Sequence, residues 1–261
     1  MTTILDVSHL LIDMDGVLYR GDLPLPRLPE FIAFLRERPI PFVLVTNNST
    51  RTPQQYADKL ARMGIEIDPA QVLTSGQATA RYLARSYPPG TRVHVFGMDS
   101  LREAILEEGF VLADENVAVV VASMDRDVTY EKLKRASLLI RSGALFVATN
   151  LDPTQPTDEG LLPGTGSMIT ALQTASETEP VAIGKPESTM FELAMQVMDA
   201  QPHTTAILGD RVDTDLAGGR QAGCRTIGVL SGSSSRAEME AFGPDFLFED
   251  IAHLLDAWQW Q

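Results

Sequence analysis

Four short apolar segments, each followed at once by polar residues, constrain the fold of this chain most. They cover residues 10–12, 42–45, 181–183 and 205–208 and are rich in β-branched side chains. Short apolar runs bounded by turn or helix signals are typical of strands buried on both faces, as in parallel sheets covered by helices. Segments with helical periodicity lie between them. This alternation predicts an α/β protein with a doubly wound, mostly parallel, Rossmann-like core sheet.

The rest of the chain continues the alternation. Strands are predicted at residues 10–13, 42–46, 72–74, 181–184, 205–209 and 225–230, and helices at 28–38, 52–63, 187–199 and 214–222. The paired glycines Gly218 and Gly219 lack the rest of a dinucleotide-binding motif and are predicted to allow close helix packing.

A second series of predicted elements lies in the middle of the chain. It comprises strands 92–97, 117–122 and 145–149 and helices 99–108, 130–142 and 165–177. These are enough for a second α/β domain, and small, polar residues at 74–76 and 176–180 are predicted hinges. We therefore predict a catalytic core domain formed by residues 1–77 and 180–261. An α/β cap domain, residues 78–179, is inserted into it.

The polar residues that follow the four core segments are chemically compatible. In chain order they are Asp13 with Asp15, then Thr46-Asn47-Asn48, then Gly184-Lys185-Pro186, then Gly209-Asp210. Open α/β sheets bind ligands at the carboxyl ends of their strands. An acid pair, a hydroxyl, an ammonium and a further acid are therefore expected to face one crevice.

The acid pair Asp13 and Asp15 has its own requirement. In an extended segment, residues two apart lie on one face. Two carboxylates held so close repel each other, so either a cation lies between them or one binds a proton. Gly16 allows the chain to turn sharply afterwards. The same pattern also occurs in ordinary turns and calcium loops, which is the alternative interpretation.

Taken together, these motifs resemble the haloacid dehalogenase-like hydrolases, and in particular their NagD-like and p-nitrophenyl phosphatase-like branch. The resemblance covers essentially the whole chain and is weaker in the middle segment, where family members differ most. It also implies an α/β cap at this point of the chain. The motifs that carry it are Asp13-Met14-Asp15-Gly16-Val17-Leu18, Val45-Thr46-Asn47-Asn48, Ala148-Thr149-Asn150-Leu151-Asp152 with Pro163-Gly164-Thr165-Gly166, Gly184-Lys185-Pro186 and Gly209-Asp210-Arg211-Val212-Asp213-Thr214-Asp215.

By this resemblance, Asp13 is predicted to be the nucleophile, attacking phosphorus to form an aspartyl phosphate that water then hydrolyses. Asp15 is predicted to protonate the leaving oxygen and later to accept a proton from the attacking water. Thr46, Asn47 and Lys185 are expected to hold the transferring phosphoryl group with a hydroxyl, an amide and an ammonium.

A hard cation with oxygen ligands is expected at the same place, because no His or Cys lies near these motifs. We predict Mg²⁺, held by Asp13, the backbone carbonyl of Asp15, and Asp210. Asp215 is predicted to orient a metal ligand or a bound water without binding the metal directly, and the alternative is a simple helix cap. For Asp213 a cap and a functional role are equally compatible with the sequence.

Composition narrows the classes of molecule that this protein is expected to bind. A formal net charge of −14, without a cluster of Lys or Arg, argues against nucleic-acid and membrane-surface partners. A single cysteine in the chain excludes an intramolecular disulfide and suits a reducing compartment. The first six residues carry neither a basic nor an apolar export signal. We therefore expect a cytoplasmic protein whose partner is a small phosphorylated metabolite, and the sequence carries no signal for an oligomeric state.

The predicted function is a Mg²⁺-dependent phosphatase acting on small organic phosphate monoesters, such as a nucleoside monophosphate, a sugar phosphate or an aryl phosphate. A dehalogenase or phosphonatase of the same fold is one alternative, and the acid at Asp15 disfavours it. A non-catalytic phospho-acceptor module is the other. The length of the chain and the inserted cap oppose that alternative.

Overall fold

The contacts within the computed structural model divide the chain into two compact units. The model describes residues 7–157 and 159–259. The first unit, here called the core unit, comprises Met1–Thr46, Pro53–Leu73 and Lys185–Gln261. The second, here called the inserted unit, comprises Asn47–Thr52 and Thr74–Gly184. These ranges differ in detail from the predicted domains 1–77 with 180–261 and 78–179.

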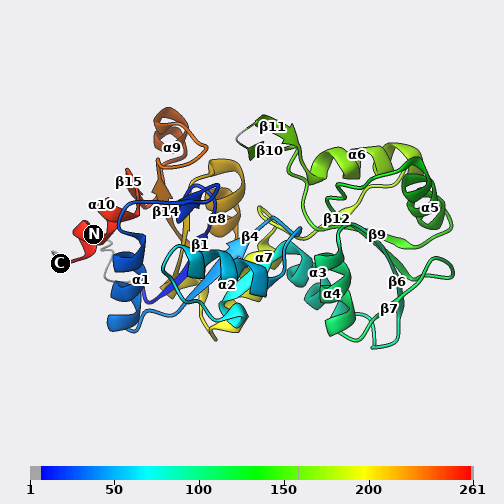
Figure 1. Ribbon diagram of the computed structural model, residues 1–261, viewed down its shortest axis with the longest axis horizontal. Coiled ribbons are helices and arrows are strands. Elements are labelled where there is room, and N and C mark those ends of the chain that lie inside the picture. The colour runs from blue at the N-terminus through cyan, green and yellow to red at the C-terminus, as the bar shows by residue number, and fades with distance from the viewer. Residues whose placement is uncertain (1–6, 158, 260–261) are drawn as a thin grey trace. The chain divides into compact units, whose positions relative to one another are not determined.

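The core unit is built on a six-stranded sheet in the order β15-β14-β13-β1-β4-β5 (Figure 1). The pairs of β1 with β4 and β13, and of β14 with β13 and β15, are parallel. The strands are β1 His9–Asp13, β4 Phe42–Thr46, β5 Val72–Thr74, β13 Thr205–Gly209, β14 Arg225–Val229 and β15 Phe246–Phe248. The helices are α1 Leu28–Glu37, α2 Pro53–Arg62, α7 Ser188–Val197, α8 Ala217–Gln221, α9 Arg236–Phe242 and α10 Ile251–Gln259.

The order of these strands creates a reversal in the middle of the sheet. From β1 the chain proceeds to β4 and β5 on one side, and later to β13, β14 and β15 on the other. Ligands of open α/β sheets bind where the strand order reverses, outside the carboxyl ends of the strands. In this sheet that point lies beside the last residue of β1. The doubly wound α/β architecture predicted from the sequence is confirmed.

Helices pack closely on both faces of the core sheet. One face forms an apolar cluster with α1, α2 and α10, in which Trp258 stacks at a tilt on Phe34 with 5.7 Å between ring centroids. Toward β13, a Cβ atom added at Gly219 would lie 3.0 Å from Cβ of Ile207 and overlap its methyl group. One added at Gly218 would overlap the ring of Phe191. The predicted role of the paired glycines in close packing is confirmed.

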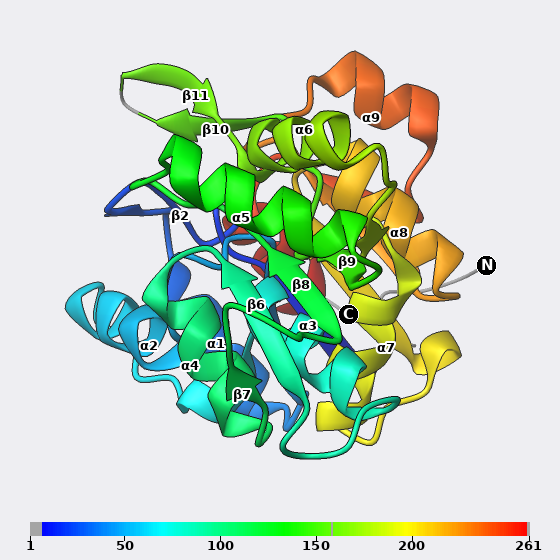
Figure 2. The same cartoon turned by 90° about the vertical axis from the view of Figure 1, so that its right-hand side faces the viewer.

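The inserted unit has a parallel five-stranded sheet of its own, in the order β12-β9-β8-β6-β7 (Figure 2). An apolar cluster joins one face of this sheet to α5 and α6. The strands are β6 Arg92–Phe96, β7 Val111–Leu112, β8 Val119–Ala122, β9 Leu145–Ala148 and β12 Val181–Ala182. The helices are α3 Ser75–Ala84, α4 Asp99–Glu107, α5 Tyr130–Arg141 and α6 Thr165–Ser176, and an antiparallel pair is formed by β10 Thr154–Thr157 and β11 Gly160–Pro163.

The short segment Asn47–Thr52 belongs to the inserted unit through hydrogen bonds. The Asn47 carbonyl accepts from Oγ of Ser75 at 2.6 Å and from Nδ2 of Asn150 at 2.8 Å. The hydroxyls of Ser49 and Ser123 also share a buried hydrogen bond. The six residues Asn47–Thr52, which follow β4 of the core unit directly in sequence, therefore belong to the inserted unit.

One sequence prediction about chain organisation was wrong. Residues 181–184 were expected to form a buried strand of the core sheet. The observed strand, Val181–Ala182, instead pairs with β9 at the edge of the inserted sheet, and Val181 is 38% exposed. At the predicted hinge 74–76, the hydroxyl of Thr74 accepts from N of Gln77 and caps α3. The division between the two units falls between Leu73 and Thr74, and a hinge role for this segment stays a prediction. The apolar run at 181–183 does not by itself reveal which sheet it joins.

No helix among the described residues is long and apolar enough to cross a membrane. The first six residues, from which the lack of an export signal was predicted, lie outside the described part of the chain.

Truncating the buried tryptophan should cost the core unit much of its stability. Trp258 is 2% exposed, so Trp258→Ala leaves a cavity against Phe34. We expect about 3–5 kcal/mol lower free energy of unfolding, measured by urea denaturation. Leu23→Ala, at a residue 75% exposed, is the control and should change it by less than about 0.5 kcal/mol. A loss for Trp258→Ala as small as that of the control would contradict this packing.

Candidate functional site

The first acid of the sequence motif closes the central strand of the core sheet. Asp13 is the last residue of β1 and pairs in register with Val45 of β4. Thr46 is the last residue of the neighbouring β4, and both Asp13 and Thr46 are buried. Each strand is an uninterrupted apolar run up to its end, so the polar residue falls at the edge where the chain leaves the sheet.

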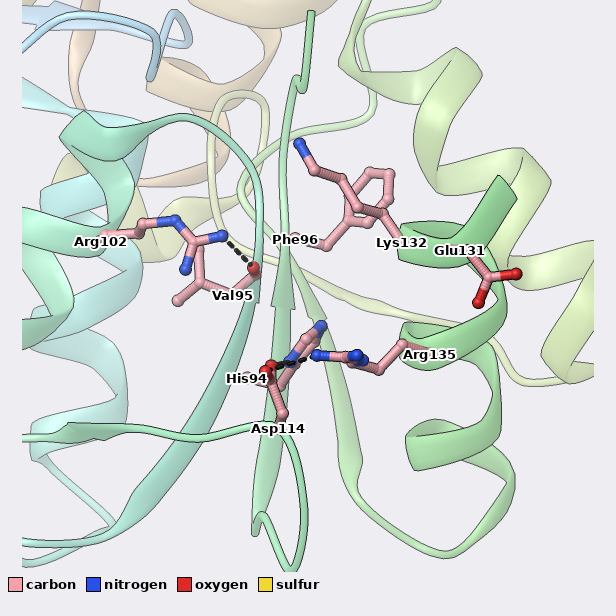
Figure 3. Close-up of a pocket in the computed structure, with 8 residues that line it drawn as sticks. All are labelled: His94, Val95, Phe96, Arg102, Asp114, Glu131, Lys132 and Arg135. Atoms are coloured by element: carbon pink, nitrogen blue, oxygen red, sulfur yellow. Dashed lines mark hydrogen bonds and ion pairs between the residues drawn. The ribbon is translucent and has the colours of Figure 1, made fainter. Parts of the chain in front are cut away.

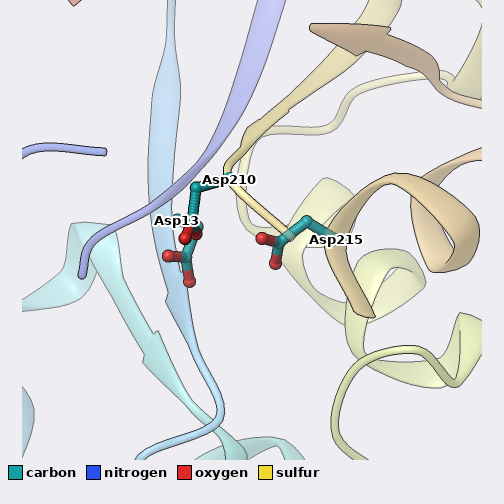
Figure 4. A group of neighbouring side chains, drawn as sticks. All are labelled: Asp13, Asp210 and Asp215. Carbon is teal, nitrogen blue, oxygen red and sulfur yellow. The ribbon is translucent and has the colours of Figure 1, made fainter. Parts of the chain in front are cut away.

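Three buried carboxylates meet at this edge. One oxygen of each of Asp13, Asp210 and Asp215 lies within 4.8 Å of the others. Figure 4 shows the Asp13 and Asp210 side chains together, with Asp215 facing them from the turn that follows β13. Asp210 follows β13, the strand beside β1, which explains why residues so far apart in sequence converge. We call these three residues the acid trio.

A tight turn brings Asp215 back to the sheet. It lies in the single π-helical turn Val212–Leu216, and its Oδ2 accepts from the backbone N–H of Arg211 at 3.1 Å. A Cβ atom at Gly209 would come within 2.7 Å of the Asp215 carboxylate. Glycine at the end of β13 therefore leaves the space that this carboxylate occupies.

Lys185 supplies the positive charge inside the trio. Its side chain is 3% exposed, and its ammonium pairs with Oδ1 of Asp13 and, at 2.7 Å, with Oδ1 of Asp215. Burial alone would lower the pKa of this lysine, but the two carboxylates more than offset that effect. The pKa of Lys185 is therefore above its ordinary value, and the group is a permanent cation.

One ammonium does not balance three carboxylates. Burial raises the pKa of Asp13 well above its usual range, although Lys185 opposes the change, and the other two acids of the trio add to it. Burial and then Asp215 raise the pKa of Asp210 to about 6, against the hydrogen bond from N of Ser233. Full ionisation of the trio therefore favours a further cation. Its carboxylate oxygens are the ligands of hard divalent ions.

Asp15 lies on the turn after β1, outside the buried trio. The turn is closed by hydrogen bonds from N of Leu18 to O of Met14 at 2.9 Å and from N of Gly16 to O of Tyr19 at 2.8 Å. Gly16 has φ of +84°, which favours glycine. The turn leads into the hairpin of β2 Tyr19–Arg20 and β3 Leu23–Pro24. Asp15 itself is exposed, so the two acids of the motif lie in different environments.

Two other residues named from the sequence lie elsewhere. Asn47 belongs to the inserted unit, where its Nδ2 donates to Oδ2 of Asp152 at 2.9 Å. Asp213 is exposed and pairs with the Arg211 guanidinium at 2.8 Å. The acid trio therefore contains neither Asn47 nor Asp213, and a functional role for Asp213 gains no support from the structure.

The segment after β14 also contributes to the site, although it was not predicted from the sequence. The backbone N–H of Ser233 donates to Oδ2 of Asp210 at 2.6 Å, and Oγ of Ser231 donates to the carbonyl of Gly16 at 2.6 Å. The signal was present, because the small polar residues 231–235 follow a predicted strand just as the other site residues do.

A cavity of about 270 Å³ in the inserted unit contains none of the predicted site residues. Its charged groups are already paired. Arg135 pairs with Asp114 at 2.5 Å (Figure 3), and Lys132 pairs with the buried Asp125 at 2.7 Å. Because these pairs satisfy its charges, we place the chemistry at the acid trio. The cavity is lined by His94, Val95, Phe96, Arg102, Asp114, Glu131, Lys132 and Arg135.

Comparison with known proteins agrees with this arrangement. Residues 10–111 match the family model of haloacid dehalogenase-like hydrolases, and residues 182–254 match a related model of the same group. The 5′-nucleotidase YutF of Bacillus subtilis is 42% identical over 88% of this chain and 89% of its own.

Solved structures give the same result. A 4-nitrophenylphosphatase of Thermotoga maritima superposes with a TM-score of 0.93 at 32% identity, covering 98% of this chain and 99% of its own. NagD of Escherichia coli K-12 gives 0.89 at 30% identity, with 94% and 97% covered. A glycerol phosphate phosphatase of Mycobacterium tuberculosis, in complex with magnesium, gives 0.88 at 33% identity, with 95% and 76% covered.

The predicted relationship to NagD and the p-nitrophenyl phosphatases is thereby confirmed. The chain belongs to the haloacid dehalogenase-like hydrolases and is a phosphoric monoester hydrolase.

Proposed function

We propose that the protein hydrolyses small organic phosphate monoesters with Mg²⁺, through an aspartyl phosphate on Asp13. The observation that carries this proposal is the buried trio Asp13, Asp210 and Asp215 around the Lys185 ammonium, at the reversal of strand order. A nucleophilic carboxylate, a fixed cation and a set of oxygen ligands are the groups that phosphoryl transfer requires.

The residues present suit magnesium. Asp13 and Asp210, with the backbone carbonyl of Asp15, would hold the ion, while Asp215 stays paired with Lys185. When bound, Mg²⁺ supplies charge stabilisation for the phosphoryl oxygens. The magnesium complex of the related glycerol phosphate phosphatase supports this choice of metal.

In the first step, an oxygen of Asp13 forms a bond to phosphorus as the ester P–O bond breaks. The leaving oxygen takes the electron pair of that bond and a proton from the carboxyl group of Asp15. Lys185 and the hydroxyl of Thr46 are proposed to stabilise the charge on the phosphoryl oxygens. For Asn47, whose amide donates to Asp152 in the inserted unit, binding of the phosphoryl group stays a prediction from the sequence.

In the second step, water attacks the phosphorus of the aspartyl phosphate. The Asp15 carboxylate takes the proton of the water, and the bond between phosphorus and Asp13 breaks. Inorganic phosphate leaves, and Asp13 is a carboxylate again. The exposed position of Asp15 suits this role, because the residue must exchange protons with successive substrates and water.

The substrate is proposed to be a small phosphorylated metabolite, such as a nucleoside monophosphate or a sugar phosphate, or an aryl phosphate. The names of the related 5′-nucleotidase, nitrophenylphosphatase and glycerol phosphate phosphatase support this class. They favour it over the dehalogenase, phosphonatase and phospho-acceptor alternatives. A cytoplasmic location stays a prediction from the sequence.

Replacing the nucleophile should stop turnover. Asp13→Asn keeps the size of the side chain but an amide does not attack phosphorus, so we expect kcat to fall by at least about 10³-fold. The assay is release of inorganic phosphate from p-nitrophenyl phosphate. Asp213→Asn, at an exposed aspartate outside the trio, is the matched control and should keep full activity. Near-normal turnover in Asp13→Asn would refute the covalent mechanism.

The effect on kcat of replacing the general acid Asp15 should depend on the leaving group. Loss of general acid catalysis in Asp15→Asn should reduce kcat by about 10²–10⁴-fold for alkyl phosphates. The loss should be smaller for aryl phosphates, whose leaving oxygens need less protonation. Phosphate release from both classes gives the ratio. Asp22→Asn, with a side chain 89% exposed on the same hairpin, is the control. Equal losses for both classes would count against the acid role.

Removing a metal ligand should raise the need for metal. Asp210→Ala is expected to raise the Mg²⁺ concentration for half-maximal rate by at least about 10–100-fold, since even indirect partners of a metal cost that much. Activity is titrated with Mg²⁺ after chelator treatment, which should itself abolish turnover. An unchanged Mg²⁺ requirement would remove Asp210 from the metal site.

A further inference from the structure

The segment Ser231–Ser234 contacts three separate parts of the candidate site. Ser231 donates its buried hydroxyl to the carbonyl of Gly16, in the turn that carries Asp15, at 2.6 Å. Ser233 donates its backbone N–H to the carboxylate of Asp210 at 2.6 Å. The hydroxyl of Ser234 accepts from the backbone N–H of Val212, where the turn that carries Asp215 begins, at 3.1 Å.

Steric contacts, in addition to the hydrogen bond from Ser233, restrict the position of the Asp210 carboxylate. A Cβ atom at Gly16 would lie 2.6 Å from Oδ2 of Asp210 and 2.9 Å from Cα of Gly232. A Cβ atom at Gly232 would overlap the Asp210 carboxylate itself. The carboxylate is therefore held between two glycines, one on the turn after β1 and one on the segment after β14.

The segment is itself anchored from the hairpin. Nε of Arg20, on β2, donates to the carbonyl of Ser231 at 2.7 Å. The hydroxyl of Ser231 thus contacts Gly16 in the turn, and its carbonyl contacts Arg20 on β2, the strand that follows the turn. Displacing Ser231 would disturb both the Asp15 turn and the support of Asp210.

We propose that Ser231–Ser234 is a positioning segment, in which Ser231 and Gly232 hold the acid-bearing turn and the metal ligand Asp210 in one fixed relation. This inference rests on the proposed function for the roles of Asp15 and Asp210. Ser231 acts through the Gly16 carbonyl, and Gly232 acts by leaving the space for the Asp210 carboxylate. Changes in this segment alter metal affinity and leaving-group protonation without changing any reacting group.

The first experiment measures Mg²⁺ binding by calorimetry in Gly232→Ala. The added methyl group displaces the Asp210 carboxylate, so Mg²⁺ affinity should fall by about 10–100-fold. In an Asp210→Gly background, which lacks both the carboxylate and the Cβ atom that the added methyl group would meet, the same substitution should cause no further fall in melting temperature. Affinity equal to that of the unmodified protein would overturn the role of Gly232.

The second experiment compares Ser231→Ala with Ser231→Cys, which keeps the shape but donates weakly. Ser231→Ala should lower kcat about 10-fold or more for alkyl phosphates and less for aryl phosphates, with KM nearly unchanged, because the Asp15 turn is no longer fixed. Ser231→Cys should lie between Ser231→Ala and the unmodified protein. These variants carry the test if Gly232→Ala does not fold.

The matched control is Thr226→Val on β14, the strand that precedes the segment. Thr226 is fully buried, and its hydroxyl donates to Asp245 at 2.8 Å, away from the trio. It should lower the melting temperature while leaving Mg²⁺ affinity and the alkyl-to-aryl ratio unchanged. The proposal is overturned if Ser231→Ala behaves like Thr226→Val. If the unmodified protein hydrolyses no phosphate monoester, the proposed function fails, and Mg²⁺ calorimetry on Gly232→Ala still decides the role of that residue.

Discussion

Burial of three carboxylates around a single ammonium is the interaction on which the core unit depends. Asp13, Asp210 and Asp215 carry three negative charges when ionised, and Lys185 returns one positive charge, so two negative charges stay uncompensated. An unbalanced charge cluster in a dry interior costs much free energy unless protons or a cation reduce it. The raised pKa values of Asp13 and Asp210 express that cost. A protein that stabilises such a cluster has already assembled most of a cation site.

The sheet topology explains why the charged side chains gather at one edge of the sheet. β1 lies at the centre of the sheet, with β4 on one side and β13 on the other, so three strand ends deliver side chains to one edge. The side chains of the acid trio and of Lys185 are buried at that edge. Space is limited there, and glycines occupy the positions where a Cβ atom would displace a carboxylate, as Gly209 does for Asp215. Backbone N–H groups, which need no side-chain volume, supply much of the remaining support.

Strand ends could be predicted from the sequence wherever one apolar run determines both the strand and its sheet. That held for Asp13, Thr46 and Asp210, whose strands are buried except for His9 at the start of β1. It failed for Val181, because a two-residue strand has no pattern that reveals which sheet it joins. Lys185 nevertheless reached the trio, since its place depends on ion pairs rather than on that strand.

Other features depend on contacts that local sequence does not encode. The pair β10–β11 was missed because both strands are only four residues long and contain proline, and β11 is exposed. Helix α3 was missed because Ser75 and Gly76 resemble a loop when the capping role of Thr74 is not known. The Ser231–Ser234 segment followed the same strand-end rule as the acids, but serine and glycine carry no charge to draw attention to it.

The attachment of Asn47–Thr52 to the inserted unit has a consequence for protein engineering. A chimaera that replaced only residues 74–184 with the insert of a relative would retain these six residues from the original chain. Their partners, among them Ser75, Ser123 and Asn150, would be gone, and the carbonyl of Asn47 would lose both of its side-chain donors. The transferable module is therefore discontinuous in sequence. A functional exchange between relatives requires the loop after β4 to be transplanted together with the insert that holds it.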